Sequence, residues 1–188
     1  MSETIRSFIA IELSPEIKAA LQQIEDELKP KIFGVKWVKP DNIHLTLKFL
    51  GHIDTHAVES VRTVLAAITQ SAKPFILGLS SLGAFPTLER PRVIWIGINK
   101  GSGESTALAN AIDDKVSEFG IEKEGRAFHP HLTLGRIDFL KDKNALKNAF
   151  ASLKVPPLAM AASKITLFQS ILVREGAIYT ILHEVALR

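Results

Sequence analysis

Hydrophobic and polar residues alternate in many short stretches of this chain, a pattern typical of β-strands with one buried face. The first such stretch is Phe8-Ile9-Ala10-Ile11. Further strands are predicted at residues 35–38, 43–50, from 75 onward, and at 93–98, 131–137, 165–173 and 178–187. Arg174-Glu175-Gly176 separates the last two strands and indicates a hairpin turn.

Helices are predicted between these strands from their caps and from the spacing of their apolar residues. Ser14 is a typical N-cap, Pro15 suits a first helical position, and Pro30 ends this first helix. Apolar residues three and four apart give the helix one buried face: Ile17, Leu21, Ile24 and Leu28. Asp54 predicts the cap of a second helix. Two more helices are predicted at residues 106–119, ended by Gly120, and at residues 142–153.

The tetrapeptide His-Leu-Thr-Leu occurs twice, at residues 44–47 and again at residues 131–134. Each copy would place its His and Thr on one face of a strand and its two leucines on the other. From the numbers of His and Thr in the chain, chance alone predicts only about 0.3 such His-x-Thr spacings. The repetition therefore favours two strands that present His44, Thr46, His131 and Thr133 to a shared cleft.

The residues after each motif carry further expectations about orientation. By strict alternation, Lys48 shares the face of His44 and Thr46, and Phe49 lies on the opposite face with the leucines. Arg136 has the opposite parity to His131 and would point away from it. A bulge permitted by Gly135 would return Arg136 to the histidine side, where its guanidinium could bind a phosphate.

The two halves of the chain repeat an order of strand, helix, motif strand, helix and strand, and the motif histidines lie 87 residues apart. We interpret this as an internal duplication within a single bilobal domain, residues 1–188, with approximate halves 1–90 and 91–188. The predicted fold class is α+β. Two pseudo-symmetric lobes, each an antiparallel sheet with helices on its outer face, would surround a central cleft.

Composition narrows the possible functions of the chain. Its 188 residues are 46% hydrophobic and 23% charged, which is ordinary for a globular protein with a substantial core. The net charge of +3 is compatible with an anionic substrate, without the dense basic stripes of a dedicated nucleic-acid binder. No cysteine is present, which excludes disulfides, zinc–thiolate sites and a Cys nucleophile. With no signal-peptide pattern and no apolar run long enough for a membrane span, we expect a cytoplasmic protein. A monomer is the expected state, although no pattern in the sequence fixes it.

The duplicated motif suits phosphoryl transfer. Each imidazole can act as acid or base near neutral pH, and in-line displacement at phosphorus needs one of each on opposite sides. Thr46, Thr133 and Arg136 would then hold the non-bridging oxygens. We expect neither a metal nor a cofactor. His52 and His56 have helical metal-pair spacing but straddle a predicted helix start, and Gly101-Ser102-Gly103-Glu104-Ser105 lacks the lysine of a phosphate-binding loop.

At these motifs the chain resembles the two-histidine phosphoesterase superfamily, and most of all its LigT branch of RNA 2′,3′-cyclic phosphodiesterases, also called 2′-5′ RNA ligases. The resemblance extends over nearly the whole chain. The blocks that carry it are Arg6 to Ile11, His44 to Gly51, Gly83 to Pro86, Arg90 to Trp95 and His131 to Arg136.

This resemblance implies a bilobal α+β fold and metal-independent opening of a terminal 2′,3′-cyclic phosphate of RNA to a 2′-phosphate, with reversible 2′-5′ ligation as a related activity. It also implies His44 as proton donor, His131 as proton acceptor, and Thr46, Thr133 and Arg136 as phosphate contacts. One departure is Thr87-Leu88-Glu89, which lengthens a loop near the expected cleft and could alter which RNA ends are admitted.

Two other classes of function are weighed against this one. A non-catalytic RNA-binding module of repeated α+β lobes would not need two matched histidines, and no aromatic-rich sheet motif is visible. A metal-dependent phosphodiesterase is disfavoured because no carboxylate–histidine cluster accompanies the motifs.

Overall fold

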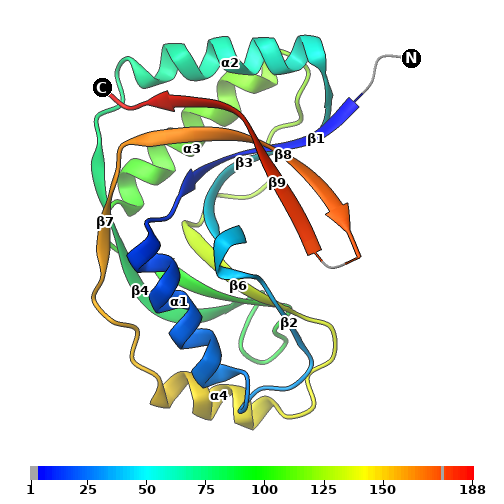
Figure 1. The fold of residues 1–188 in the computed structure, drawn as a ribbon, viewed down its shortest axis with the longest axis vertical. Coiled ribbons are helices and arrows are strands. Elements are labelled where there is room, and N and C mark those ends of the chain that lie inside the picture. The colour runs from blue at the N-terminus through cyan, green and yellow to red at the C-terminus, as the bar shows by residue number, and fades with distance from the viewer. Residues whose placement is uncertain (1–3, 175) are drawn as a thin grey trace.

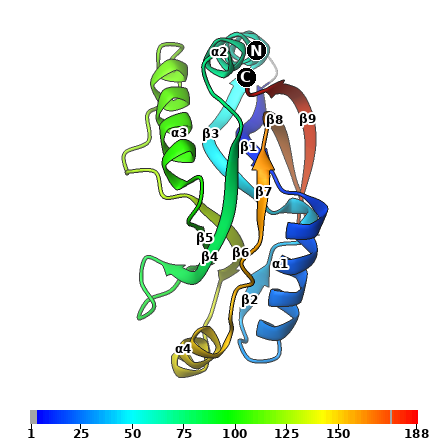
Figure 2. The same cartoon turned by 90° about the vertical axis from the view of Figure 1, so that its left-hand side faces the viewer.

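The computed structural model describes residues 4–174 and 176–188, whose strands form two antiparallel sheets (Figures 1 and 2). One sheet has four strands in the order β3-β1-β8-β9, and the other has five in the order β2-β6-β5-β4-β7. The strands are β1 (Thr4–Glu12), β2 (Val35–Trp37), β3 (His44–Asp54), β4 (Phe75–Phe85), β5 (Val93–Ile98), β6 (His131–Ile137), β7 (Ala159–Ala162), β8 (Lys164–Val173) and β9 (Gly176–Ala186).

Four α-helices accompany the sheets in the described part of the chain, and the predicted α+β class is confirmed. They are α1 (Pro15–Leu28), α2 (Thr55–Thr69), α3 (Ser102–Ser117) and α4 (Lys143–Ser152), with a 3-10 turn η1 (Pro40–Asn42) before β3. Helices α2 and α3 lie beside one another at the four-stranded sheet, whereas α1 and α4 lie toward the other end of the molecule (Figures 1 and 2). None of the helices within the described ranges is both long and apolar enough to cross a membrane.

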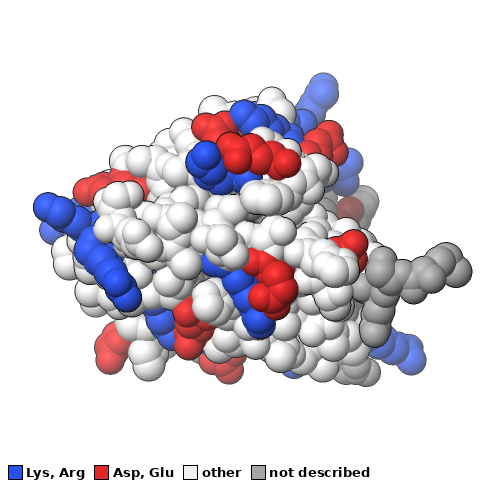
Figure 3. Space-filling model, turned by 90° about the horizontal axis from the view of Figure 1, so that it is seen from above, with Lys and Arg blue, Asp and Glu red and all other residues white. Residues whose placement is uncertain are grey.

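The face of the molecule that carries α2 has mixed surface charge. Seen from above the view of Figure 1, it shows basic and acidic side chains next to one another, with uncharged surface between them (Figure 3). Helix α2 itself carries an ion pair, Arg62 with Glu59 at 2.8 Å. Among the described residues, this face therefore has no continuous basic stripe of the kind that follows a nucleic-acid backbone.

The predicted helix caps are present. The Ser14 side chain accepts a hydrogen bond from the Ile17 amide at 3.4 Å, and Asp54 accepts one from the Ala57 amide at 2.9 Å. Asp142 accepts from two amides in the first turn of α4. Each side chain satisfies amides that have no partner within the helix, which explains why these starts could be read from the sequence.

Helix α3 starts at Ser102 rather than at Thr106, so the predicted start was wrong. Gly101 stands at its N-cap with a φ of 76°, a left-handed conformation, and no side chain caps the helix. A Cβ on Gly101 would lie 2.5 Å from the Ile76 carbonyl oxygen, so a glycine is needed there. Without a capping side chain, the sequence carried no visible signal for this start.

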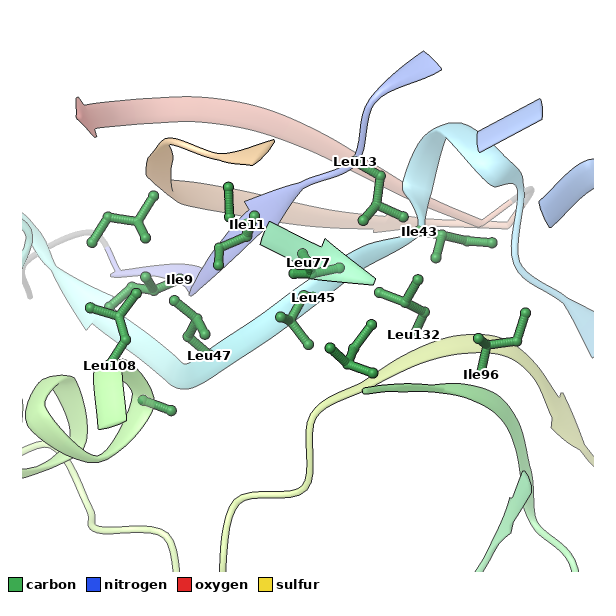
Figure 4. Close-up of a cluster of buried hydrophobic side chains, with 14 of the residues drawn as sticks. Ile9, Ile11, Leu13, Ile43, Leu45, Leu47, Leu77, Ile96, Leu108 and Leu132 are labelled. Atoms are coloured by element: carbon green, nitrogen blue, oxygen red, sulfur yellow. The ribbon is translucent and has the colours of Figure 1, made fainter. Parts of the chain in front are cut away.

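The core lies between the two sheets, and both motif strands contribute to it. Leu45 and Leu132 are fully buried, as expected for the apolar partners of His and Thr. They lie in one cluster with side chains from β1, β4, β5 and α3 (Figure 4). The motif leucines therefore hold the sheets together on the face opposite to the one that carries the histidines.

Each sheet takes strands from both parts of the chain. Strands β8 and β9 extend the sheet of β1 and β3, while β2 and β4 join the sheet of β5, β6 and β7. A boundary near residue 90 therefore does not divide the strands between the sheets. The two-lobed architecture is present, but its lobes exchange segments.

Candidate active site

A cavity of about 1190 Å³ is lined by residues from both sheets. All the residues singled out with the motif line it: His44, Thr46, His131, Thr133 and Arg136. Two strands from different sheets thus bring together five side chains that are separated by up to 92 positions in the chain. The shared cleft expected from the repeated motif exists.

A β-bulge follows the His-x-Thr segment in both motif strands. In β3, Thr46 pairs with Ala10 and Lys48 with Ile9, which leaves Leu47 without a partner. In β6, Thr133 pairs with Trp95 and Gly135 with Ile94, which leaves Leu134 without one. An extra residue reverses the alternation of every side chain beyond it.

The bulge in β6 puts Arg136 on the same side as His131 and Thr133, where it lines the cavity. The conditional expectation of a bulge here is therefore confirmed, with Leu134 as the extra residue. Gly135 has a second role, since a Cβ on it would lie 2.6 Å from the Val35 side chain on the neighbouring β2.

The bulge in β3 reverses the orientations that simple alternation predicts for Lys48 and Phe49, so the prediction for Lys48 was wrong. Lys48 turns inward and is 3% exposed, so that it borders the cavity only as a buried side chain, whereas Phe49 lines the cavity and is 51% exposed. Phe49 and Arg136 occupy equivalent positions, five residues after the histidine of each motif. The two sides of the cavity thus carry an apolar ring and a cation at matched places.

His44 lies in an aromatic environment on the four-stranded sheet. Its ring stacks on Phe8, with centroids 4.6 Å apart, and meets the edge of Tyr179 at 5.3 Å. Burial lowers its pKa to about 4, although a hydrogen bond with the backbone of Asn42 acts in the opposite direction. The imidazole is therefore neutral at pH 7.

His131 has a similar setting on the five-stranded sheet. Its ring meets Phe85 edge-on at 4.9 Å, and its Nδ1 lies 2.6 Å from the carbonyl oxygen of His129. That contact assigns the hydrogen to Nδ1 and leaves Nε2 available as a base. Burial lowers the pKa of His131, and the nearby Arg136 lowers it further. Each imidazole forms a hydrogen bond with the backbone two residues before it, His44 with Asn42 and His131 with His129. In this respect the two settings are equivalent.

Lys48 connects the first motif strand to the segment that leads into the second. Its Nζ donates to the Glu122 carbonyl oxygen at 2.6 Å and pairs with Asp113 of α3 at 2.7 Å. Asp113 also accepts from the Glu124 amide at 3.2 Å. This cluster fixes the start of the 121–130 segment, which carries His129 to its contact with His131.

The other histidines considered from the sequence lie elsewhere. His52 is on β3 and His56 is on α2, so the pair straddles the helix start as expected, and neither lines the cavity. Within residues 4–174 and 176–188, no group of three or more His, Asp or Glu side chains is placed to bind a metal ion. The Thr87-Leu88-Glu89 segment lies outside the cavity lining, although its neighbour Pro86 belongs to it.

Several side chains that line the cavity were not predicted from the sequence: Arg6 and Phe8 of β1, Phe49 of β3, and Tyr179 of β9. Arg6 and Phe8 alternate with the buried Ser7 and Ile9, a pattern that could have assigned them to one face of the strand. The position of Tyr179 depends on which strands are neighbours, which no local pattern indicates.

Comparison with known proteins identifies relatives along the whole chain. The model of the family described as LigT like Phosphoesterase matches twice, over residues 11–95 and 96–179. A protein of Aquifex aeolicus named RNA 2′,3′-cyclic phosphodiesterase is 34% identical over 185 residues, covering 97% of each chain. A crystal structure from Thermus thermophilus superposes with a TM-score of 0.82 at 27% identity, covering 98% of each chain. That of Escherichia coli LigT with 3′-AMP gives 0.79 at 28% identity, covering 98% of this chain and 99% of LigT.

This protein is thus a phosphoesterase by fold and by sequence. It belongs to the LigT-like phosphoesterase family, and the resemblance read from the motifs is confirmed.

Proposed function

We propose that this protein hydrolyses the 2′,3′-cyclic phosphate ends of RNA to 2′-phosphates, without a metal ion, using His44 and His131 as acid and base. The observation that carries this proposal is the equivalence of the two imidazoles. Each faces the same cavity from its own sheet, each has a threonine two residues further on, and each bonds backbone two residues before it. The names of relatives such as the Aquifex aeolicus phosphodiesterase support the choice of substrate.

In this mechanism, a water molecule attacks phosphorus while Nε2 of His131 takes its proton. The bond between phosphorus and the 3′ oxygen breaks on the opposite side, and His44 donates a proton to that oxygen. The product is a 2′-phosphate and a free 3′ hydroxyl. Thr46, Thr133 and Arg136 hold the non-bridging oxygens, where negative charge increases in the transition state.

The lowered pKa values of both histidines fit a site in which an imidazole becomes protonated only when the substrate binds. Burial disfavours the imidazolium form in both cases. A cyclic phosphate carries one negative charge, and its arrival between the rings would favour protonation of one of them. Binding would therefore favour uptake from solvent of the proton that His44 needs as an acid.

A ribose 5′ hydroxyl could replace the attacking water, and the same groups would then form a 2′-5′ linkage. This step follows from the proposed geometry of attack and needs no further residue. We propose it as a secondary activity. It is measurable as the joining of an RNA that ends in a cyclic phosphate to one with a 5′ hydroxyl.

The test is incubation with adenosine 2′,3′-cyclic phosphate, with and without a chelator, followed by phosphorus NMR of the product. We expect 2′-AMP in both samples. Replacement of either His44 or His131 by Ala should lower turnover by at least about a hundredfold while the fold is retained. Binding without turnover in the wild-type protein would instead favour a non-catalytic RNA-binding module, and loss of turnover with chelator would indicate a metal enzyme.

A predominant 3′-AMP product would show that the substrate binds in the reverse sense. In that case the acid and base assignments of His44 and His131 would be exchanged, because the acid must stand beside the oxygen that leaves.

A further inference from the structure

Arg6 of β1 lines the cavity beside the residues proposed for catalysis. It shares a face of the strand with Phe8, the residue on which His44 stacks, and lies about 7 Å further along the strand. Its Nη1 donates to the Ser170 hydroxyl of β8 at 2.9 Å. This contact fixes a half-buried guanidinium at one side of the proposed phosphate site.

The Arg6 guanidinium has no carboxylate partner among residues 4–174 and 176–188. Lys36, another cation of the cavity lining, pairs with Asp138 at 2.7 Å. Arg6 instead meets a neutral hydroxyl, which leaves most of its five N–H donors available. A cation held partly out of water without a counter-charge costs free energy unless an anion binds to it.

A second arginine lies nearby from the opposite sheet. Arg6, Arg136 and Tyr179 line the same cavity. Burial raises the pKa of the Tyr179 hydroxyl, and the positive charges of Arg6 and Arg136 act against that rise. Two permanent positive charges, one from each sheet, therefore face one cavity. Because like charges repel, this arrangement suits a ligand with more than one anionic group.

We propose that Arg6, with the hydroxyl of Tyr179, binds the phosphate on the 5′ side of the terminal nucleotide, while Arg136 and the two histidines bind the cyclic phosphate. The inference rests on the proposed function and adds a second phosphate site to it. One ribose separates these two phosphates in RNA. Arg6 is likewise set apart from His44, since Phe8, which stacks on His44, follows Arg6 by two residues on β1. The second site would favour RNA ends over free cyclic nucleosides.

The test compares the binding of two products that differ by one phosphate, 2′-AMP and adenosine 2′,5′-bisphosphate, by isothermal titration calorimetry. We expect the wild-type protein to bind the bisphosphate at least about tenfold more tightly, the gain of a charge-assisted contact. Arg6→Gln should remove this preference. Tyr179→Phe should reduce it by a smaller factor, since only one hydroxyl is lost.

Arg92→Gln is the matched control, since Arg92 lines the same cavity from a position just before β5. Any change that this variant makes through its charge should affect both ligands alike and leave the ratio of their affinities as in the wild type. Equal affinity of the wild-type protein for the two ligands would overturn the proposal. So would a preference that survives in Arg6→Gln, or an equal loss for both ligands, which would place Arg6 at the proposed catalytic phosphate.

Because binding is measured with products, the result does not depend on turnover. If the protein discriminates the two ligands through Arg6 but does not open cyclic phosphates, the second phosphate site is supported and the proposed function is wrong. Thermal unfolding of each variant identifies any that does not fold, and Arg6→Lys, which keeps the charge, then serves as the second variant with an expected partial loss.

Discussion

At the scale of single residues, the burial of His44 determines how the site responds to pH. Its ring is enclosed by Phe8 and Tyr179, and its pKa falls to about 4 from an ordinary value of 6.5. We expect its ring resonances to titrate near pH 4 in the free protein and at higher pH with 2′-AMP bound, because the phosphate stabilises the imidazolium. NMR titration measures both values, and the spectrum of His44→Asn assigns the resonance. No upward movement with ligand would contradict an acid role for His44.

The same shift in pKa carries a consequence for stability. Between pH 6.5 and pH 4, the unfolded chain takes up a proton at His44 that the folded protein does not, so stability falls as the pH is lowered through this interval. The loss from this residue is at most about 3 kcal/mol. His44→Asn should therefore show a smaller loss over the same range in urea denaturation.

Arg136 is the residue at which guanidinium shape matters more than charge. A fork of N–H donors can hold two oxygens of one phosphate, whereas an ammonium acts as a point charge. We expect Arg136→Lys to lower kcat for a 2′,3′-cyclic nucleotide by at least about tenfold. Arg126→Lys, on another exposed arginine of the cavity lining, is the control and should stay within about twofold. Equal effects of the two changes would indicate that only the general positive potential matters.

At the scale of elements, the two bulges explain what the sequence could and could not predict. Motif histidines and threonines were correctly placed because the first three residues of each motif follow simple alternation. The orientation of Lys48 was wrong because the extra residue Leu47 arises from pairing with β1, which a single strand does not reveal. Strand β7 escaped prediction for a related reason, since Ala159–Ala162 has no alternation and exists by pairing with β4.

The inward turn of Lys48 links three elements, and its loss should be costly. Lys48→Met keeps the length of the side chain but leaves the Glu122 carbonyl and Asp113 without their donor. Because these partners are only partly buried, we expect a loss of about 2 kcal/mol in the free energy of unfolding. Urea denaturation measures it. Lys36→Met, which removes an exposed ion pair with Asp138, should change stability by less than about 0.5 kcal/mol.

The pKa of Asp113, the carboxylate partner of Lys48, reports on the same ion pair. Burial alone would raise the pKa of its carboxyl, but the hydrogen bonds from Lys48 and the Glu124 amide outweigh this, and the pKa is lowered. A lowered pKa means that the cluster contributes stability above the ordinary value of 3.8 and loses it as pH falls further. An unchanged stability in Lys48→Met at neutral pH would show that the cluster is dispensable.

At the scale of the whole molecule, the exchange of strands makes the two lobes interdependent. Strand β4 lies between β5 and β7, and β8 lies between β1 and β9, so each sheet contains an interior strand from the other part of the chain. The repeated motif pointed to two related lobes, yet it could not show this exchange, because strand order depends on contacts between residues far apart in the sequence.

We therefore expect the protein to unfold as one cooperative unit. Trp37 on β2 and Trp95 on β5 report on the five-stranded sheet by fluorescence, while far-UV circular dichroism reports on both sheets and all helices. The two signals should give the same midpoint in urea. Fragments 1–100 and 101–188, cut in the turn after β5, should each be unfolded alone, because the first lacks β6 and β8 and the second lacks every neighbour of β6. Two separate transitions, or a fragment that folds by itself, would show that the lobes are independent domains despite their shared strands.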